Sequence, residues 1–276
     1  MLKQKVSKFL CYLFFIVLAV ICIIPVYMLL INATRSTPEI NRGISLIPGS
    51  HLPINWHSLT IRGISFTRGL LNSMLLAFST TILSVYFALM TAYAIKVYNF
   101  KFRNQFFIFV VMMTMVPGQL YIIGFFQYVA ALNLLNSYIP LILPSIAAAG
   151  TVFFAKQYFD ASLMPELIQS ARIDGASEIQ IFNRIALPLA APGAFTMGIF
   201  AFVGSWNSFL TPFMLLTDQN LFTLPLMMAQ LNSDPFVTDF GMIYTGMAFT
   251  LIPVIIVYIL FSKKIISGIS LGSVKG

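Results

Sequence analysis

The sequence predicts an all-α integral membrane protein with six transmembrane helices, and three observations predict it. Hydrophobic residues make up 59% of the 276 residues, charged residues make up 9%, and the mean hydropathy is +0.90. About a quarter of the residues of a soluble domain are charged. Long uncharged stretches recur along the chain, and one polar stretch, 164–192, separates two of them. Because lipid offers the backbone no hydrogen-bond partner, such stretches are expected to be helices.

The uncharged stretches have the length of membrane-crossing helices. The first, 9–31, is longer than the roughly 7–15 residues of a signal-peptide core, so we expect it to be an uncleaved span. The stretch 104–155 carries no charge and is too long for one crossing, so we place a turn at 133–137. The six predicted spans are 9–31, 69–95, 105–131, 138–159, 193–216 and 241–261.

The distribution of basic residues predicts the orientation of the chain. Six spans place both termini on one side, and positive residues favour the cytoplasmic side. On the other side we place Arg35, Arg42, Arg62 and Arg68, and the first external loop is therefore the weakest part of this assignment. We expect a multi-pass protein of the cell (inner or plasma) membrane with cytoplasmic termini. The basic residues on the cytoplasmic side are Lys3, Lys5, Lys8, Lys96, Lys101, Arg103, Lys156, Arg172, Arg184, Lys263, Lys264 and Lys275.

The polar stretch 164–192 has the pattern of two short helices joined by a sharp turn. Pro165 suits a first helical position, and Gly175 suits the left-handed conformation that ends a helix. Ser177 and Gln180 have the spacing of a capping box, which starts a second helix. We expect Pro188 to end that helix. Its apolar residues form a ridge that is expected to dock into a groove on a partner; they are Ile179, Ile181, Phe182, Ile185 and Ala186.

This stretch resembles the EAA loop of ATP-binding-cassette (ABC) importer permeases. The resemblance rests on Gln169-Ser170-Ala171, on Gly175, and on Ile185, Leu187 and Pro188 at the family's spacing. The run Ala-Arg-Ile-Asp-Gly-Ala-Ser is similar to the sugar-importer branch, the maltose-type second permease subunit. The family usually has Glu-Ala-Ala where this chain has Gln169-Ser170-Ala171.

The resemblance implies a type I ABC importer permease fold with a cytoplasmic coupling elbow. It divides the chain into an N-terminal span with its external loop (1–68), a permease core (69–262) with the elbow at 164–190, and a cytoplasmic tail (263–276). The implied partners are a second homologous permease chain, two ATPase subunits and an extracytoplasmic solute-binding protein. The implied contacts with the ATPase are made by Gln169, Ser170, Ala171, Asp174, Gly175, Ile179, Phe182, Ile185 and Pro188.

The resemblance also implies a function, import of a sugar or oligosaccharide driven by ATP that the partner subunit binds. The segment Ser205-Trp206-Asn207 looks like the family's Gly-Ser-Trp-Asn segment and is the candidate lining of the pathway, with helix–helix hydrogen bonding as its alternative. Away from their ends the predicted spans contain no Asp, Glu, Lys, Arg or His, which disfavours a proton- or voltage-driven carrier. The alternatives are the same machine for another solute, such as a phosphorylated polyol, and a membrane scaffold that transports nothing.

Several other functions are disfavoured by the sequence. It contains no phosphate-binding Gly-x-x-x-x-Gly-Lys-Ser/Thr motif, so we expect no ATPase activity or cofactor in this chain. The net charge of +8 accompanies no nucleic-acid-binding module, so we expect no nucleic-acid partner. His51 and His57 lie in one loop without further ligands of suitable spacing, so we expect no metal site.

Overall fold

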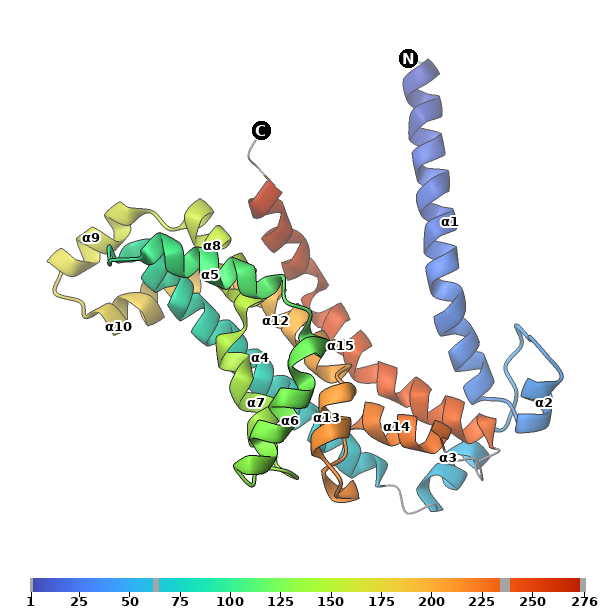
Figure 1. The fold of residues 1–276 in the computed structure, drawn as a ribbon. Helices are drawn as coiled ribbons and strands as arrows, with labels where there is room; N and C mark the ends of the chain where they lie inside the picture. Colours follow the sequence, from blue (N-terminus) through green and yellow to red (C-terminus); the bar gives the residue numbers. More distant parts are fainter. Residues whose placement is uncertain (1, 62–64, 234–238, 274–276) are drawn as a thin grey trace. The chain divides into compact units, whose positions relative to one another are not determined.

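The protein is described by a computed structural model that covers residues 2–61, 65–233 and 239–273 (Figure 1). In these residues the regular structure is entirely helical. The N-terminal part contains α1 (Leu2–Ala33), α2 (Thr37–Asn41) and α3 (Leu52–Ile61). The next part contains α4 (Phe66–Val97), α5 (Arg103–Thr114), η1 (Gly118–Tyr121), α6 (Ile122–Ala131), α7 (Ile139–Ile142), η2 (Leu143–Ala147) and α8 (Ala149–Ser162).

The remaining elements begin with the predicted elbow. They are α9 (Pro165–Ile173), α10 (Glu178–Ile181), the π-helix η3 (Phe182–Ala186), α11 (Leu187–Leu189), α12 (Ala191–Trp206), α13 (Leu210–Leu215), η4 (Gln219–Leu221), α14 (Leu224–Ser233) and α15 (Phe240–Ser273). α15 continues as a helix beyond the predicted end of the sixth span, through most of the predicted tail.

Five of the six predicted spans correspond to helices that are long and apolar enough to cross a membrane, singly or as a bent pair. Four single helices qualify within the described residues: Ser7–Ala33, Phe66–Val97, Ile139–Ser162 and Phe240–Ser262. Two bent pairs raise the number to six if each pair is one span, Arg103–Thr114 with Gly118–Ala131 and Glu178–Leu189 with Ala191–Trp206. The first pair bends by 89° at Pro117-Gly118, where proline removes a helical hydrogen bond.

Two predicted boundaries were wrong. The fifth span was expected over 193–216, but α12 ends at Trp206 and a break precedes α13. The stretch 217–240 lies between two predicted spans and carries Asp218, Asp234 and Asp239, which predicts a polar loop. It contains α14 instead, whose buried side chains are Leu224, Leu226, Met227, Met228 and Leu231. The sequence hides this helix because its apolar residues stand between Asp218 and Asp234, in a region that its flanking charges mark as polar.

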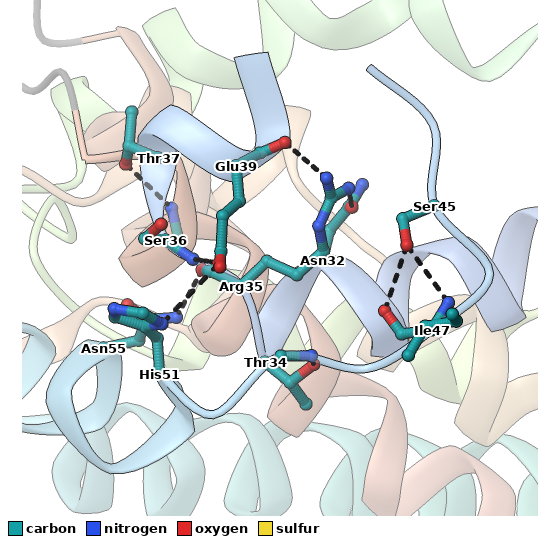
Figure 2. A network of polar contacts seen from close by, with 12 residues as sticks. Asn32, Thr34, Arg35, Ser36, Thr37, Glu39, Ser45, Ile47, His51 and Asn55 are labelled. Carbon is teal, nitrogen blue, oxygen red and sulfur yellow. Dashed lines mark hydrogen bonds and ion pairs between the residues drawn. The ribbon is translucent and has the colours of Figure 1, made fainter. Parts of the chain in front are cut away.

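The chain forms two compact units, of which the first comprises 1–66 and 227–252. Its hydrogen bonds join the C-terminal end of α1 to α3 and α15. Asn55 Nδ2 donates to the carbonyl oxygens of Ala33 (2.9 Å) and Arg35 (3.0 Å), and Thr245 Oγ1 donates to the same Ala33 oxygen (2.9 Å). A Cβ at Gly241 would fall 2.7 Å from the Arg35 oxygen, so only glycine allows this close approach. The predicted external loop thus contains the two helices α2 and α3 and a polar network (Figure 2).

The second unit comprises 67–226 and 253–276, and its core supports the elbow. α4, α8 and the segment from α9 to α12 contribute the buried side chains of this core, among them Leu89, Phe159, Ile168 and Ile181. α12 approaches α8 closely at Gly193. A Cβ at this position would fall 2.5 Å from the ring of Tyr158, so glycine permits the approach. The elbow is therefore built on packed helices of its own unit.

Candidate functional site

The first half of the elbow is α9, whose start and buried face follow from its sequence. The backbone of Met164 is extended before Pro165 enters the helix, and Glu166 stands in the first turn, where a carboxylate complements the positive helix end. Ile168 and Ala171 are buried against the core, whereas Gln169 and Ser170 are exposed. The predicted Gln169-Ser170-Ala171 triplet therefore presents two polar side chains outward, and Ala171 packs inward.

The turn between the helices has the predicted geometry. Gly175 has φ +80°, in the left-handed region that favours glycine. The amide of Ala176 donates to the oxygen of Ala171 (3.1 Å), which closes the end of α9. Ser177 and Gln180 then form the predicted capping box: Ser177 N donates to Gln180 Oε1 (2.9 Å), and Gln180 N donates to Ser177 Oγ (3.4 Å). Local sequence alone thus fixes this turn.

The second half of the elbow ends near Pro188, as expected, but it contains an unexpected π-helix. The helix that begins at Glu178 ends at Leu189, one residue after Pro188, and a bend of 79° separates it from α12. Between α10 and α11 the backbone is a π-helix, whose wider turn rotates the following residues relative to an ideal α-helix. A period of 3.6 residues therefore misplaces the faces of this segment.

The predicted apolar ridge is divided between the core and the surface. Ile181, Phe182 and Ala186 are buried. The Phe182 ring lies 5.6 Å from that of Tyr86 and 5.5 Å from that of Tyr93, both on α4. Ile185 is half-buried and packs on the same core. Most of the ridge therefore covers the chain's own α4 and α8, and Phe182 is not on a docking surface.

A different set of apolar side chains projects from the elbow. Ile173 and Ile179 are 86% and 75% exposed, and Met164 and Leu167 are also exposed. Sequence reasoning included Ile179 but missed Ile173, which stands between Arg172 and Asp174 and so reads as part of a polar surface. Asp174 and Pro188 are exposed as well. The surface offered by the elbow is thus a mixture of isolated aliphatic and polar side chains.

Glu178 joins both halves of the elbow to the end of α4. Arg172 Nε donates to Glu178 Oε1 (2.6 Å), while Tyr98 Oη (2.6 Å) and Tyr93 Oη (3.2 Å) donate to Glu178 Oε2. The Arg172 guanidinium, and then Tyr98, hold the pKa of the Glu178 carboxyl below its ordinary value. The Arg172 side chain also lies over the Tyr98 ring, with 5.9 Å from Cζ to the centroid. This carboxylate therefore links α9 to the C-terminal end of α4.

A second ionic group lies at the same ends of α4 and α8. Lys96 Nζ is 3.3 Å from Asp160 Oδ1, and Lys156 donates to Asp160 Oδ2. Lys156 Nζ also lies 5.0 Å from the centroid of the Phe107 ring on α5. The sequence places Lys156 within the last turn of the fourth span. Its ammonium group forms an ion pair with Asp160, one helical turn later.

The candidate pathway segment lies at the break after α12. Trp206 is buried and stacks on Phe202 with 5.7 Å between centroids and 20° between planes. Asn207 is exposed and Ser205 is half-buried. The backbone of Asn207 still donates to Val203 O (3.0 Å), so the helix ends at this residue. The three residues therefore differ in burial: Trp206 packs within the unit, Ser205 is half-buried and Asn207 is exposed.

Long apolar helices interrupted by an exposed polar elbow define the class as a multi-pass membrane protein, and comparison with known proteins identifies its family. The family model described as "binding-protein-dependent transport system inner membrane component" matches residues 84–269. The chain belongs to this family and is a permease subunit of an ABC importer.

The relatives cover nearly the whole chain. The arabinooligosaccharides transport system permease protein AraQ of Bacillus subtilis (strain 168) is 35% identical over 267 residues, which are 96% of this chain and 94% of AraQ. The sn-glycerol-3-phosphate transport system permease protein UgpE of Escherichia coli (strain K12) is 30% identical over 256 residues, which are 90% of this chain and 91% of UgpE.

A solved structure shares the fold. It is a chain of the "bacterial ABC transporter involved in the import of the acidic polysaccharide alginate", with a TM-score of 0.82 at 18% identity. The match covers 95% of this chain and 97% of that chain. The fold is therefore that of a type I ABC importer permease, as the sequence predicts.

Proposed function

We propose that this permease imports a sugar or oligosaccharide and that the 164–190 elbow couples it to a separate ATPase. The observation that carries the coupling is the exposure of Ile173 and Ile179 on an elbow that is otherwise packed on its own unit. Isolated aliphatic side chains on a rigid helical corner suit a groove on a partner protein. ATP is bound by the partner subunit, and this chain hydrolyses none.

The substrate class is supported by two observations. The two AraQ relatives, whose names specify arabinooligosaccharides, are 35% and 36% identical, against 30–31% for the UgpE relatives, whose names specify sn-glycerol-3-phosphate. The candidate pathway segment carries a serine and an asparagine but no cation, and a phosphorylated solute calls for a cation more than a neutral sugar does. A phosphorylated polyol is the second candidate.

The proposed assembly contains a second permease chain, two ATPase subunits and an extracytoplasmic solute-binding protein. Both termini and the elbow face the cytoplasm, and the external loops face the binding protein. Residues 1–68 form the first span and external loop, 69–262 form the core, and 263–276 form a cytoplasmic tail.

Purification of the tagged chain from its native membrane, with mass spectrometry of the proteins that accompany it, tests this assembly. We expect a second permease, an ATPase and a solute-binding protein. The binding protein is then titrated with arabinooligosaccharides and with glycerol 3-phosphate by calorimetry. If the binding protein binds only glycerol 3-phosphate, the proposed substrate class changes from a sugar to a phosphorylated polyol. A chain that purifies alone in mild detergent would favour a scaffold.

Photo-cross-linking tests the elbow itself. Benzoyl-phenylalanine at Ile173 or Ile179 is expected to form an adduct with the ATPase in the membrane. The matched position is Phe182, where the buried aromatic ring is expected to give only products within this chain, and Val17 in α1 is a lipid-facing control. Adducts with the ATPase from Phe182 but not from Ile179 would contradict the proposed surface.

A further inference from the structure

The loop between α2 and α3 carries an exposed apolar cluster that transport does not explain. Ile44, Leu46 and Ile47 are 87%, 66% and 76% exposed. The side chains of α1 between Phe9 and Leu18, which cross lipid, are 45–69% exposed. Each of these loop side chains is thus about as exposed as the side chains of the span, or more so. A loop in water does not ordinarily gather three large aliphatic side chains within four positions.

The loop lies beside the membrane-crossing part of α1. Tyr27 Oη donates to the carbonyl oxygen of Leu46 (2.7 Å), and Tyr27 stands six residues before the end of the span Ser7–Ala33, which is about 9 Å along the axis. Helical side chains lean toward the N-terminus of their helix, so the Tyr27 hydroxyl is not lifted toward the end of α1. Leu46 is therefore held well below that end.

The length of the span converts this position into a depth. Its 27 residues extend about 40 Å, which matches the hydrocarbon core together with the headgroup regions. Tyr27 then lies at the boundary between headgroups and acyl chains, where tyrosine is enriched. The loop turns back from the end of α1 to this boundary, and the amides of Gly49 and His51 return it to Thr34 Oγ1 (2.9 Å) and Thr34 O (2.8 Å).

Several polar backbone groups of the loop have partners within the protein. Arg35 Nη1 donates to Gly43 O (3.1 Å), and Tyr27 donates to Leu46 O. Ser45 Oγ accepts from Ile47 N (3.1 Å) and donates to Ile47 O (3.2 Å) (Figure 2). Pro48 has no amide hydrogen to satisfy. Irregular backbone near the hydrocarbon needs such internal partners, whereas a loop in water does not.

We propose that loop 43–50 is a lipid anchor that inserts Ile44, Leu46 and Ile47 into the membrane interface at the C-terminal end of α1. The occupant of this surface is lipid, because the cluster continues the lipid-facing surface of α1 at the depth of Tyr27, and the carbonyl of Leu46 and both backbone groups of Ile47 have partners within the protein. The anchor fixes how far α1 rises from the bilayer, and with it the network of Arg35 and Asn55. A protein partner, such as the binding protein or the second permease, is the competing occupant.

Spin-label accessibility in the intact importer tests this proposal. The full chain, purified with its partner subunits, is placed in nanodiscs of phosphatidylethanolamine and phosphatidylglycerol after Cys11→Ser and Cys22→Ser. Single labels at Ile44→Cys and Ile47→Cys are compared with Val17→Cys in the span and Gln219→Cys, an exposed polar position. Collision with oxygen reports lipid, and collision with a water-soluble nickel chelate reports water.

We expect the oxygen-to-nickel ratio at positions 44 and 47 to exceed that at Gln219 severalfold and to approach that at Val17. A ratio equal to that at Gln219 would overturn the proposal, because the loop would then lie in water. Low collision rates with both reagents would also overturn it, in favour of a protein partner. Neither overturning result would affect the assignment of the chain as a permease.

Discussion

Glu178 shows how one residue can link a surface helix to the end of a transmembrane helix. Its carboxylate accepts hydrogen bonds from Arg172 of α9 and from Tyr93 and Tyr98 at the end of α4. The ion pair is partly exposed, so it contributes little to stability. Its geometric effect is larger, because three donors hold the Glu178 carboxylate and so orient the turn around Gly175 relative to α4. We therefore expect Glu178 to act as a positioning residue in coupling.

A double-mutant cycle tests this role. Glu178→Gln is expected to lower ATP-dependent uptake severalfold, and Arg172→Gln is expected to lower it less, because Glu178 also binds both tyrosines. The double variant should transport no worse than Glu178→Gln alone, since the two residues act through one ion pair. Uptake into proteoliposomes and ATPase activity are measured together. Multiplicative losses in the double variant would show that the residues act independently.

The pH dependence of the same contact has a defined sign. Because Arg172 and Tyr98 hold the pKa of Glu178 below its ordinary value, the contact stabilises the elbow above the unfolded-state pKa of about 4.3. That stabilisation is lost as the pH falls through the lower pKa of the folded state. Transport at pH 6 to 8 should therefore be insensitive to this group, and a midpoint for Glu178 in that range, measured by comparing wild type with Glu178→Gln, would contradict the geometry.

Gly175 allows a clean test of backbone conformation. A Cβ at Gly175 would meet nothing within 4 Å, but its φ is +80°, whereas a Cβ at Gly150, in α8, would also meet nothing and Gly150 has no positive φ. We expect Gly175→Ala to cost about 1–2 kcal/mol and to lower uptake, and Gly175→Asn to be milder. Gly150→Ala, the matched control, should be neutral or slightly stabilising. Thermal unfolding in detergent and uptake assays distinguish them; equal effects at both glycines would count against the left-handed turn.

At the scale of elements, α12 ends within the segment Ser205-Trp206-Asn207, which the resemblance assigns as a whole to the candidate pathway. Trp206 is buried and stacked on Phe202, and Asn207 is exposed at the break before α13. The helix ends between these two neighbours, so the tryptophan belongs to the packing of α12. We predict that the exposed asparagine contacts the solute.

Paired substitutions separate these roles. Trp206→Ala is expected to destabilise the protein by about 3–5 kcal/mol and to reduce its amount in the membrane, while Trp206→Phe retains the stacking and most of the stability. Asn207→Ala should leave the thermal midpoint unchanged and raise the KM for uptake. An Asn207→Ala variant with unchanged KM and maximal rate would remove this residue from the pathway.

At the scale of the whole molecule, six spans and the distribution of basic residues predict one topology. Single cysteines at Lys101, between α4 and α5, and at Asp218, between α13 and η4, should differ in their reaction with a membrane-impermeant maleimide. In intact cells, or spheroplasts where an outer membrane is present, we expect labelling at 218 but not at 101, and in inverted vesicles the reverse. Cys11 and Cys22 are first replaced by serine. Labelling of both positions from one side would contradict six crossings.

The sequence by itself determined the membrane class, the positions of five of the six spans and the local geometry of the elbow turn. These depend on interactions between near neighbours or on composition: lipid requires long uncharged helices, Gly175 supports a left-handed turn, and Ser177 with Gln180 forms a capping box. The spacing of the elbow residues also led to the permease family that the comparisons confirm.

Only the tertiary structure decided which apolar side chains face outward. Periodicity places residues on a common face but does not tell whether that face covers the protein's own core or waits for a partner. Phe182 is covered by Tyr86 and Tyr93 of α4, which lie far away in the sequence, while Ile179 is left exposed. The π-helix at 182–186 rotates the pattern further, and α14 is buried by contacts that no local signal announces. Long-range packing decides these points, and a local pattern does not contain it.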